Sequence, residues 1–295
     1  MHVDQLTVTA DVVRRLVDEQ HPRWRHLPVR AVASQGTVNA IFRLGDDLAV
    51  RLPLQGDDPD ATRAWLESER DAMAELAAST TVPTPVPVAL GEPGAGYPLP
   101  WAVQTWLPGT DATADDPASS VVFARDMARL VLDLRAVDTR GRRFAGAGRG
   151  GHLPDHDAWM QECLRRSARL LDVHRLGLLW DELRVLPRED PDGMTHGDLV
   201  PGNVLVAGGR LTGVLDGGGF GPADPALDLV SAWHLLDAAP REELRRALGP
   251  SDLEWARGRA WAFQQAMGLV WYYERSNPGM SRLGRRTLRR LLERE

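Results

Sequence analysis

The chain contains no lysine, a single cysteine and no excess of basic residues. With only Cys163, no intramolecular disulfide can form and no cysteine-based zinc cluster can be assembled, which is typical of a reducing cytoplasm. The net charge of −6 argues against nucleic acid as the main partner. The first residues, Met-His-Val-Asp-Gln, lack the basic and apolar regions of a secretory signal, and no segment approaches the apolar length of a membrane span. We therefore expect a soluble cytoplasmic protein without nucleic-acid, membrane or obligate protein partners.

What is present is an ordinary globular composition, with 43% hydrophobic and 26% charged residues among 295, enough to build a full core. Every basic side chain except histidine is arginine. Any mechanism that normally uses a lysine must therefore use another residue here.

The first part of the chain, residues 1–107, has strand-like patterns and two helical ones. Thr9 and the apolar spacing after it predict a helix over residues 9–20, and a second helix is expected over 60–78. Alternating residues on both sides of Gly45-Asp46-Asp47 indicate a β-hairpin. A further strand pair is expected at 86–90 and 101–107, and Pro108-Gly109 then provides a turn, where we place a domain boundary.

The second part, residues 108–295, is mainly helical in pattern. A short β-like island occupies 204–206 and 211–215, with a turn at Gly208-Gly209. Helices are expected over residues 118–136, 155–174, 224–237, 240–248, 252–275 and 279–293.

The most specific motif is His196-Gly197-Asp198-Leu199-Val200-Pro201-Gly202-Asn203. An Asp followed five residues later by an Asn is typical of the kinase catalytic loop, although Gly197 stands where protein kinases carry Arg. Asp198 would orient the attacking hydroxyl and accept its proton, while the Pro-Gly turn returns the Asn203 amide oxygen toward Mg²⁺. Asp216 ends the next strand and would supply the second hard oxygen ligand.

An alternative interpretation makes Asp198 and Asp216 ordinary turn residues, since Asp beside Gly is common in turns. The ordered set of His-Gly-Asp, Asn and Asp around a β-like island favours the phosphoryl-transfer interpretation.

Together with Gly-Val-Leu-Asp at 213–216 and Gly-Pro-Ala-Asp-Pro-Ala-Leu-Asp-Leu at 221–229, this motif resembles the aminoglycoside phosphotransferase family of small-molecule antibiotic kinases. The resemblance implies an α+β, two-lobed protein-kinase-like fold, with a small antiparallel-sheet N-lobe and a larger, mostly helical C-lobe. It also implies that Asp198 is the catalytic base, that Asn203 and Asp216 are Mg²⁺ ligands, and that Asp224 and Asp228 brace the catalytic loop. The chain departs from the family pattern at Gly217 and Gly218, where an aromatic residue usually follows the metal-binding Asp.

The same resemblance assigns nucleotide-binding residues in 1–107. The segment Ser34 to Asn39 resembles the nucleotide-positioning loop, whose polar groups reach phosphate oxygens. Arg51 stands in place of the third-strand lysine, with Glu69 as its expected helix partner and Glu67 as the fallback. Residues 101–107 resemble the hinge, where backbone groups near Gln104 to Trp106 would contact the base of ATP or GTP.

The acceptor site is less defined by sequence. The segment Arg149-Gly150-Gly151-x-Leu153 followed by Asp157 resembles one that some family members place near the substrate cleft. Asp157 and Glu274 are candidate carboxylates for a cationic acceptor, whereas Tyr272 belongs to an aromatic set suited to a macrolide or nucleoside.

The predicted activity is transfer of the γ-phosphoryl group of ATP or GTP, with Mg²⁺, to a hydroxyl of a small-molecule antibiotic, with an aminoglycoside as the first choice. The alternatives are a macrolide or nucleoside antibiotic, a primary metabolite, or a non-catalytic pseudokinase. Arg51 at the lysine position and the altered residues after Asp216 motivate the last alternative.

Overall fold

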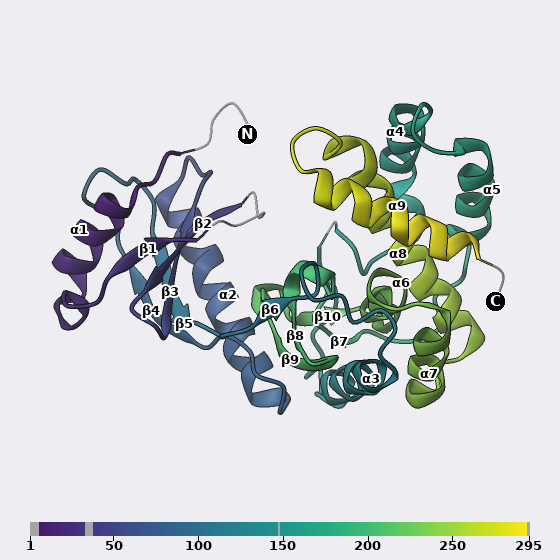
Figure 1. Ribbon diagram of the computed structural model, residues 1–295, viewed down its shortest axis with the longest axis horizontal. Coiled ribbons are helices and arrows are strands. Elements are labelled where there is room, and N and C mark those ends of the chain that lie inside the picture. Colours follow the sequence, from purple (N-terminus) through teal and green to yellow (C-terminus); the bar gives the residue numbers. More distant parts are fainter. Residues whose placement is uncertain (1–5, 33–37, 147, 294–295) are drawn as a thin grey trace. The chain divides into compact units, whose positions relative to one another are not determined.

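The hairpin predicted around Gly45 is the centre of a five-stranded antiparallel sheet in the computed structural model, which describes residues 6–32, 38–146 and 148–293 (Figure 1). The strand order is β1-β2-β3-β5-β4, and Gly45 makes the β2–β3 turn with a φ of 63°, which favours glycine. The strands are β1 Val29–Ala31, β2 Asn39–Leu44, β3 Leu48–Pro53, β4 Pro87–Gly91 and β5 Trp101–Thr105.

This sheet belongs to the first of two units into which the chain divides, residues 1–78 with 83–108; the second unit comprises 79–82 and 109–295. The boundary predicted from sequence lay after residue 107. Each unit is described here by itself.

Two helices accompany the sheet in the first unit, α1 Ala10–Gln20 and α2 Pro59–Ser79, with a 3-10 turn η1 Pro22–Trp24 after α1. The Thr9 hydroxyl accepts a hydrogen bond from the Val12 N–H and so caps α1, as the sequence predicted. The buried face of α1 joins a core cluster that includes Trp101. A Cβ on Gly91 would lie 2.1 Å from the Trp101 ring, so only glycine lets this indole cross strand β4.

The second unit holds the expected β-like island as strands β8 Val204–Ala207 and β9 Arg210–Val214, joined by β6 Thr110–Asp111 into a three-stranded sheet. A separate antiparallel pair, β7 Gly193–Thr195 and β10 Gly221–Ala223, was not predicted. These two short strands flank the motif region, since β7 leads into His196 and β10 follows Asp216. Short 3-10 turns η3 Pro201–Asn203 and η4 Gly217–Gly219 lie between them.

Helices make up most of the second unit (Figure 1). The helix predicted over 155–174 is wrong beyond Ser167, because the chain turns and starts a new helix that Asp172 caps. The helix predicted over 224–237 begins as a 3-10 helix and becomes α-helical at Ser231. The elements are α3 Val121–Arg135, η2 Leu153–His156, α4 Asp157–Ser167, α5 Val173–Leu183, η5 Pro225–Val230, α6 Ser231–Leu235, α7 Ala238–Leu248, α8 Asp252–Tyr272 and α9 Pro278–Leu292.

A buried ion pair ties α8 to the start of η5. The Arg257 guanidinium donates two hydrogen bonds to Asp224 Oδ2, at 2.5 and 3.0 Å, and the Trp261 indole N–H donates a third at 2.8 Å. Arg257 also donates to the carbonyls of Leu186 and Pro187. The pair is therefore fully hydrogen-bonded, which a buried charge requires.

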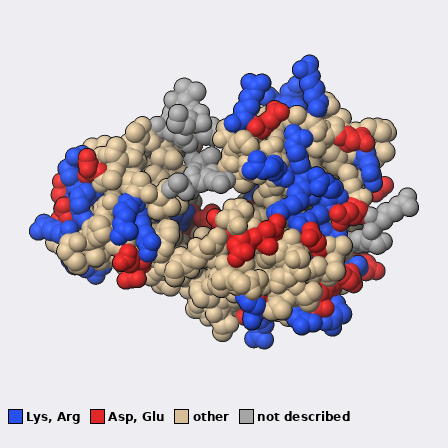
Figure 2. Space-filling view, in the orientation of Figure 1, with Lys and Arg blue, Asp and Glu red and all other residues tan. Residues whose placement is uncertain are grey.

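Helix α9 is attached to the second unit by its arginines, which gather over this helix in the view of Figure 2. Arg286 pairs with Asp116, and Arg290 pairs with Asp237. Among the described residues, no helix has both the length and the apolar character needed to cross a lipid bilayer.

A fully buried histidine links α6 with α8 and α9. His234 Nε2 lies 3.0 Å from Gln265 Oε1, and His234 Nδ1 lies 3.0 Å from Thr287 Oγ1. Burial lowers the pKa of His234 to about 3, because the surrounding protein solvates an imidazolium poorly. His234 is therefore neutral in the folded protein at any pH near 7.

Replacing His234 with Gln is expected to weaken the pH dependence of stability. The unfolded chain binds a proton at His234 near its ordinary pKa of 6.5, whereas the folded chain does not do so until about pH 3. Acidification below pH 6.5 therefore favours unfolding, and from pH 7 to pH 5 this one group should remove ~2 kcal/mol from the free energy of unfolding.

Urea unfolding of both proteins at a series of pH values measures this effect. The difference in the free energy of unfolding between the wild type and His234→Gln should become smaller by that amount on going from pH 7 to pH 5. A gap of the same size at every pH would contradict the neutral state of the buried imidazole.

Candidate active site

The backbone of the motif segment is held by one buried carboxylate. Asp228, which is 1% exposed, accepts hydrogen bonds from the N–H groups of His196 and Gly197, both at 2.9 Å. Burial raises the pKa of Asp228, against the opposing effects of His196 and of the two N–H donors. Gly197 has a φ of +81°, a left-handed conformation that a glycine adopts without strain. The bracing role expected for Asp228 is confirmed.

The His196 ring joins this segment to the strand that ends at Asp216. Its Nε2 donates to the Leu215 carbonyl at 2.9 Å, and its Nδ1 accepts from the Asp198 N–H at 3.3 Å. The Leu215 N–H in turn donates to the Asn203 carbonyl at 2.8 Å. Asp198, Asn203 and Asp216, which sequence reasoning grouped together, are therefore held at adjacent points of one backbone network.

Three side chains donate hydrogen bonds to the Asp198 carboxylate. Asn203 Nδ2 lies 2.9 Å from Oδ2, while Arg149 Nη2 and Gln265 Nε2 lie 2.9 and 3.0 Å from Oδ1. Arg149 and Gln265 were not among the predicted site residues. The sequence segment around Arg149 resembles one that lies near the substrate cleft in some family members, whereas no sequence pattern indicates Gln265, on helix α8.

The backbone next to Arg149 is fixed by its glycine neighbour. Gly150 has a φ of +98°, and a Cβ there would lie 2.7 Å from the Ala223 Cβ. The Gly150 carbonyl accepts a hydrogen bond from the Asp224 N–H at 2.9 Å. Arg149 therefore extends toward Asp198 from an anchored position, although its own side chain is 37% exposed.

The chemistry of Asn203 and Asp216 fits a magnesium ion. Asn203 donates its amide nitrogen to both the carboxylate and the carbonyl of Asp198, so the remaining polar atom of its side chain is the oxygen, a hard acceptor. Asp216 adopts a left-handed conformation, with φ 60° and ψ 43°, which Asp tolerates better than most residues. The residues that the structure describes contain no cluster of three or more His, Cys, Asp or Glu suited to a metal.

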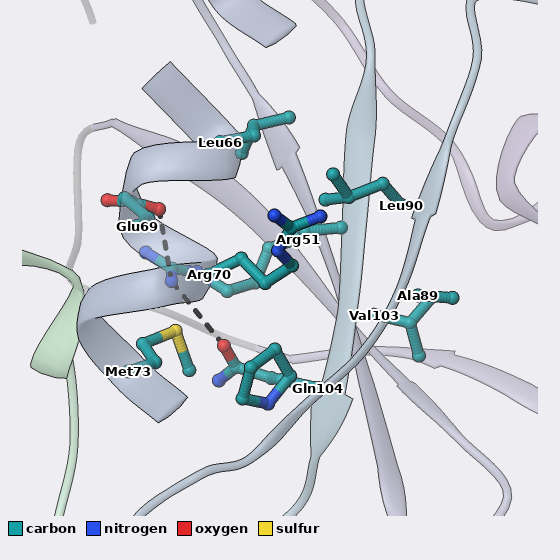
Figure 3. A pocket seen from close by; sticks show the side chains of 11 residues that line it. Arg51, Leu66, Glu69, Arg70, Met73, Ala89, Leu90, Val103 and Gln104 are labelled. Carbon is teal, nitrogen blue, oxygen red and sulfur yellow. Dashed lines mark hydrogen bonds and ion pairs between the residues drawn. The ribbon is translucent and has the colours of Figure 1, made fainter. Parts of the chain in front are cut away.

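In the first unit, Arg51 and Glu69 form the ion pair that the sequence predicted. Arg51 is 8% exposed, and its Nη1 lies 3.6 Å from Glu69 Oε2 and 3.4 Å from Gln104 Oε1 (Figure 3). These residues line a pocket of about 270 Å³ between α2 and strands β3, β4 and β5. Burial strengthens such a pair relative to one on the surface.

The other predicted nucleotide-binding residues have different surroundings. Ser34 lies outside the described residues, and Asn39 begins β2. In the predicted hinge, the Thr105 N–H donates to the Val86 carbonyl and the Trp106 N–H donates to the Asp47 carbonyl. Those two N–H groups are used within the first unit, so contact with a base at these residues would involve their carbonyls.

The predicted acceptor residues are spread along the second unit. Asp157 begins α4, and its carboxylate accepts from the Trp180 indole at 3.0 Å and pairs with Arg184 at 2.5 Å. Tyr272, which is 41% exposed, ends α8 seven residues after Gln265, about 10 Å along the helix axis. Glu274 is exposed just beyond that helix end.

Comparison with known proteins identifies the family of this chain. The model of the phosphotransferase enzyme family (APH) matches residues 29–261. An aminoglycoside 3'-phosphotransferase from Streptomyces fradiae is 32% identical over 170 residues, which are 52% of this chain and 59% of that relative. The match therefore spans only about three-fifths of that relative's length.

Two kinds of solved structure are similar in fold. The GDP complex of an aminoglycoside 2'-phosphotransferase of type IIIa has a TM-score of 0.72 at 18% identity, covering 96% of this chain and 99% of that one. A macrolide 2'-phosphotransferase from Brachybacterium faecium has a TM-score of 0.60 at 21% identity, covering 97% and 99%. The predicted two-part α+β fold is confirmed, and the chain belongs to the phosphotransferase enzyme family.

Proposed function

We propose that this phosphotransferase moves the γ-phosphoryl group of ATP or GTP to a hydroxyl of a small-molecule antibiotic, with an aminoglycoside as the first candidate. The observation that carries the proposal is the arrangement of Asp198 and Asn203 on one loop. A hydrogen bond from the His196 ring connects this loop to Leu215, the residue before Asp216. This is the set of groups that phosphoryl transfer requires. The expected location is the cytoplasm, where nucleoside triphosphates are available.

In this proposal Asp198 orients the acceptor hydroxyl and takes up its proton as the oxygen attacks phosphorus. An ionised carboxylate can do so because it is acceptor-only, and hydrogen bonds from Asn203 and Gln265 fix its direction. The His196 ring keeps the loop in place by donating to the Leu215 carbonyl.

Asn203 Oδ1 and the Asp216 carboxylate would hold Mg²⁺, and Arg51 would pair with nucleotide phosphates while Glu69 and Gln104 keep its guanidinium in place. When bound, the ion bridges phosphate oxygens and neutralises the charge that develops during transfer. Bound GDP in a solved relative of the same fold supports a nucleotide donor.

The aminoglycoside acceptor is supported by the Streptomyces fradiae relative, which is an aminoglycoside 3'-phosphotransferase. A macrolide is the second candidate, because a specific pair of observations favours it. The Asp157 carboxylate is neutralised by Arg184, and Trp159 and Tyr272 expose aromatic surface, each 41% exposed. An apolar acceptor uses such a surface better than a polycation does.

The test is an assay of the purified protein with MgATP or MgGTP and a panel of aminoglycosides, macrolides, nucleoside antibiotics and hydroxyl-bearing primary metabolites. Mass spectrometry should detect the gain of one phosphoryl group on an antibiotic, and chelation of Mg²⁺ should abolish it. Phosphorylation of a metabolite alone would shift the assignment to metabolism. Nucleotide that raises the melting temperature without any turnover would identify a pseudokinase.

Replacing Asp198 with Ala is expected to lower kcat by ~10²- to 10⁴-fold, the usual contribution of a general base. Asp155→Ala is the matched control, because the Asp155 side chain is 72% exposed and pairs only locally with His152. The control should keep wild-type kcat. Retained turnover by a folded Asp198→Ala protein would refute the assignment of the base.

Replacing Arg51 with Gln is expected to raise the KM for nucleotide by ~10- to 100-fold, since a charge-assisted hydrogen bond to phosphate contributes ~1.5–3 kcal/mol. The nucleotide-dependent rise in melting temperature should fall in parallel.

Arg70→Gln provides the control for this experiment. Arg70 lines the same pocket, but its guanidinium pairs with its neighbour Asp71. An unchanged KM in Arg51→Gln would mean that the pair with Glu69 only holds α2 against the sheet.

A further inference from the structure

A buried chain of hydrogen bonds leads from helix α9 to the Asp198 carboxylate. Thr287 contacts His234, His234 contacts Gln265, and Gln265 contacts Asp198, each contact spanning 3.0 Å. Thr287 and His234 are fully buried and Gln265 is 8% exposed. Most buried polar side chains form hydrogen bonds, because an unpaired polar group in the interior costs free energy.

Only one hydrogen-bond direction fits this chain. The Gln265 end that faces a carboxylate must be its NH₂, because an ionised carboxylate accepts only. Gln265 Oε1 then faces His234 Nε2, which must carry the proton. Since the imidazole is neutral, its Nδ1 accepts from the Thr287 hydroxyl. Every donor in this series of hydrogen bonds is thus directed toward Asp198.

We propose that Gln265 is a positioning residue for Asp198, and that His234 and Thr287 hold its amide in the donating orientation. This inference rests on the proposed function, in which Asp198 receives the acceptor's proton. None of the three residues needs to touch nucleotide or acceptor in this role.

The two partners of Asp198 Oδ1 differ in a way that separates their roles. Arg149 is 37% exposed on a loop, whereas Gln265 is 8% exposed and is fixed at its far end by His234. An incoming hydroxyl needs an acceptor position on Asp198, and the exposed arginine is the partner that it can replace. Gln265 on Oδ1 and Asn203 on Oδ2 then still hold the carboxylate plane from both sides.

The same stretch of chain supports both the backbone and the side chain of the motif. Asp228, on η5, holds the N–H groups of His196 and Gly197, and His234 lies on the helix that follows directly. A shift of this stretch would therefore move the loop and the orienting amide together.

The first experiment compares Gln265→Leu with Gln264→Leu. The neighbouring Gln264 is equally buried, at 8%, but its amide contacts His156 and not Asp198. We expect Gln265→Leu to lower kcat by ~10- to 100-fold with the KM for nucleotide unchanged, because misplacement by about an ångström costs up to about that much. The Gln264→Leu protein should keep its kcat within about twofold.

The second experiment changes Thr287, the residue of the hydrogen-bond series farthest from Asp198, where no substrate contact can be lost. Thr287→Val removes the hydroxyl with little change of shape, and Thr287→Ser keeps it. The valine variant should lower kcat by ~3- to 10-fold, and the serine variant should restore it, again without a change in the KM for nucleotide. Melting temperatures identify any variant that fails to fold. If Gln265→Leu fails to fold, the comparison of Thr287→Val with Thr287→Ser tests the positioning role.

The outcomes separate this inference from the function on which it rests. A wild type that phosphorylates no acceptor overturns both, since Asp198 then has no proton to accept. If the wild type is active, unchanged kcat in both Gln265→Leu and Thr287→Val overturns the positioning role alone. Equal losses in the Gln264 and Gln265 variants, or losses confined to KM, would also overturn it.

Discussion

The geometry of this site depends on a carboxylate that never meets substrate. Without Asp228, the N–H groups of His196 and Gly197 would lack an acceptor in the interior, at a cost comparable to a lost hydrogen bond each. Because this carboxylate fixes the turn at Gly197, the His196 ring contacts the Leu215 carbonyl, and the segments that carry Asn203 and Asp216 stay in register. One buried anion therefore determines the relation between the loop and the strand.

The polar groups around this loop form further buried ion pairs and hydrogen bonds. Asp224 pairs with Arg257 and anchors the backbone just after Arg149 through the Gly150 carbonyl, while His234 connects helices α6, α8 and α9. Buried polar networks contribute little net stability but penalise alternative packings strongly. The network through His234 holds the Gln265 amide against the Asp198 carboxylate in one arrangement.

Sequence reasoning predicted what local patterns encode. Periodicity and capping identified α1 and the β2–β3 hairpin, and fixed spacing identified Asp198 with Asn203. It missed β7 and β10, whose three residues each carry no periodicity and pair with residues 26 to 30 positions away in the sequence. It also missed Gln265, because a hydrogen bond between residues 67 apart leaves no local trace. The helix break after Ser167 was signalled only by the Asp172 cap.

Arg51 stands at the position where the kinase pattern has a lysine, and this changes the chemistry available in the pocket that it lines. Kinases with a lysine at that position expose a primary amine, which acylating nucleotide analogues and aldehyde-bearing inhibitors can modify covalently. An arginine guanidinium, in contrast, is far less nucleophilic than a primary amine. Reagents that modify kinases through that amine should therefore not react at this position.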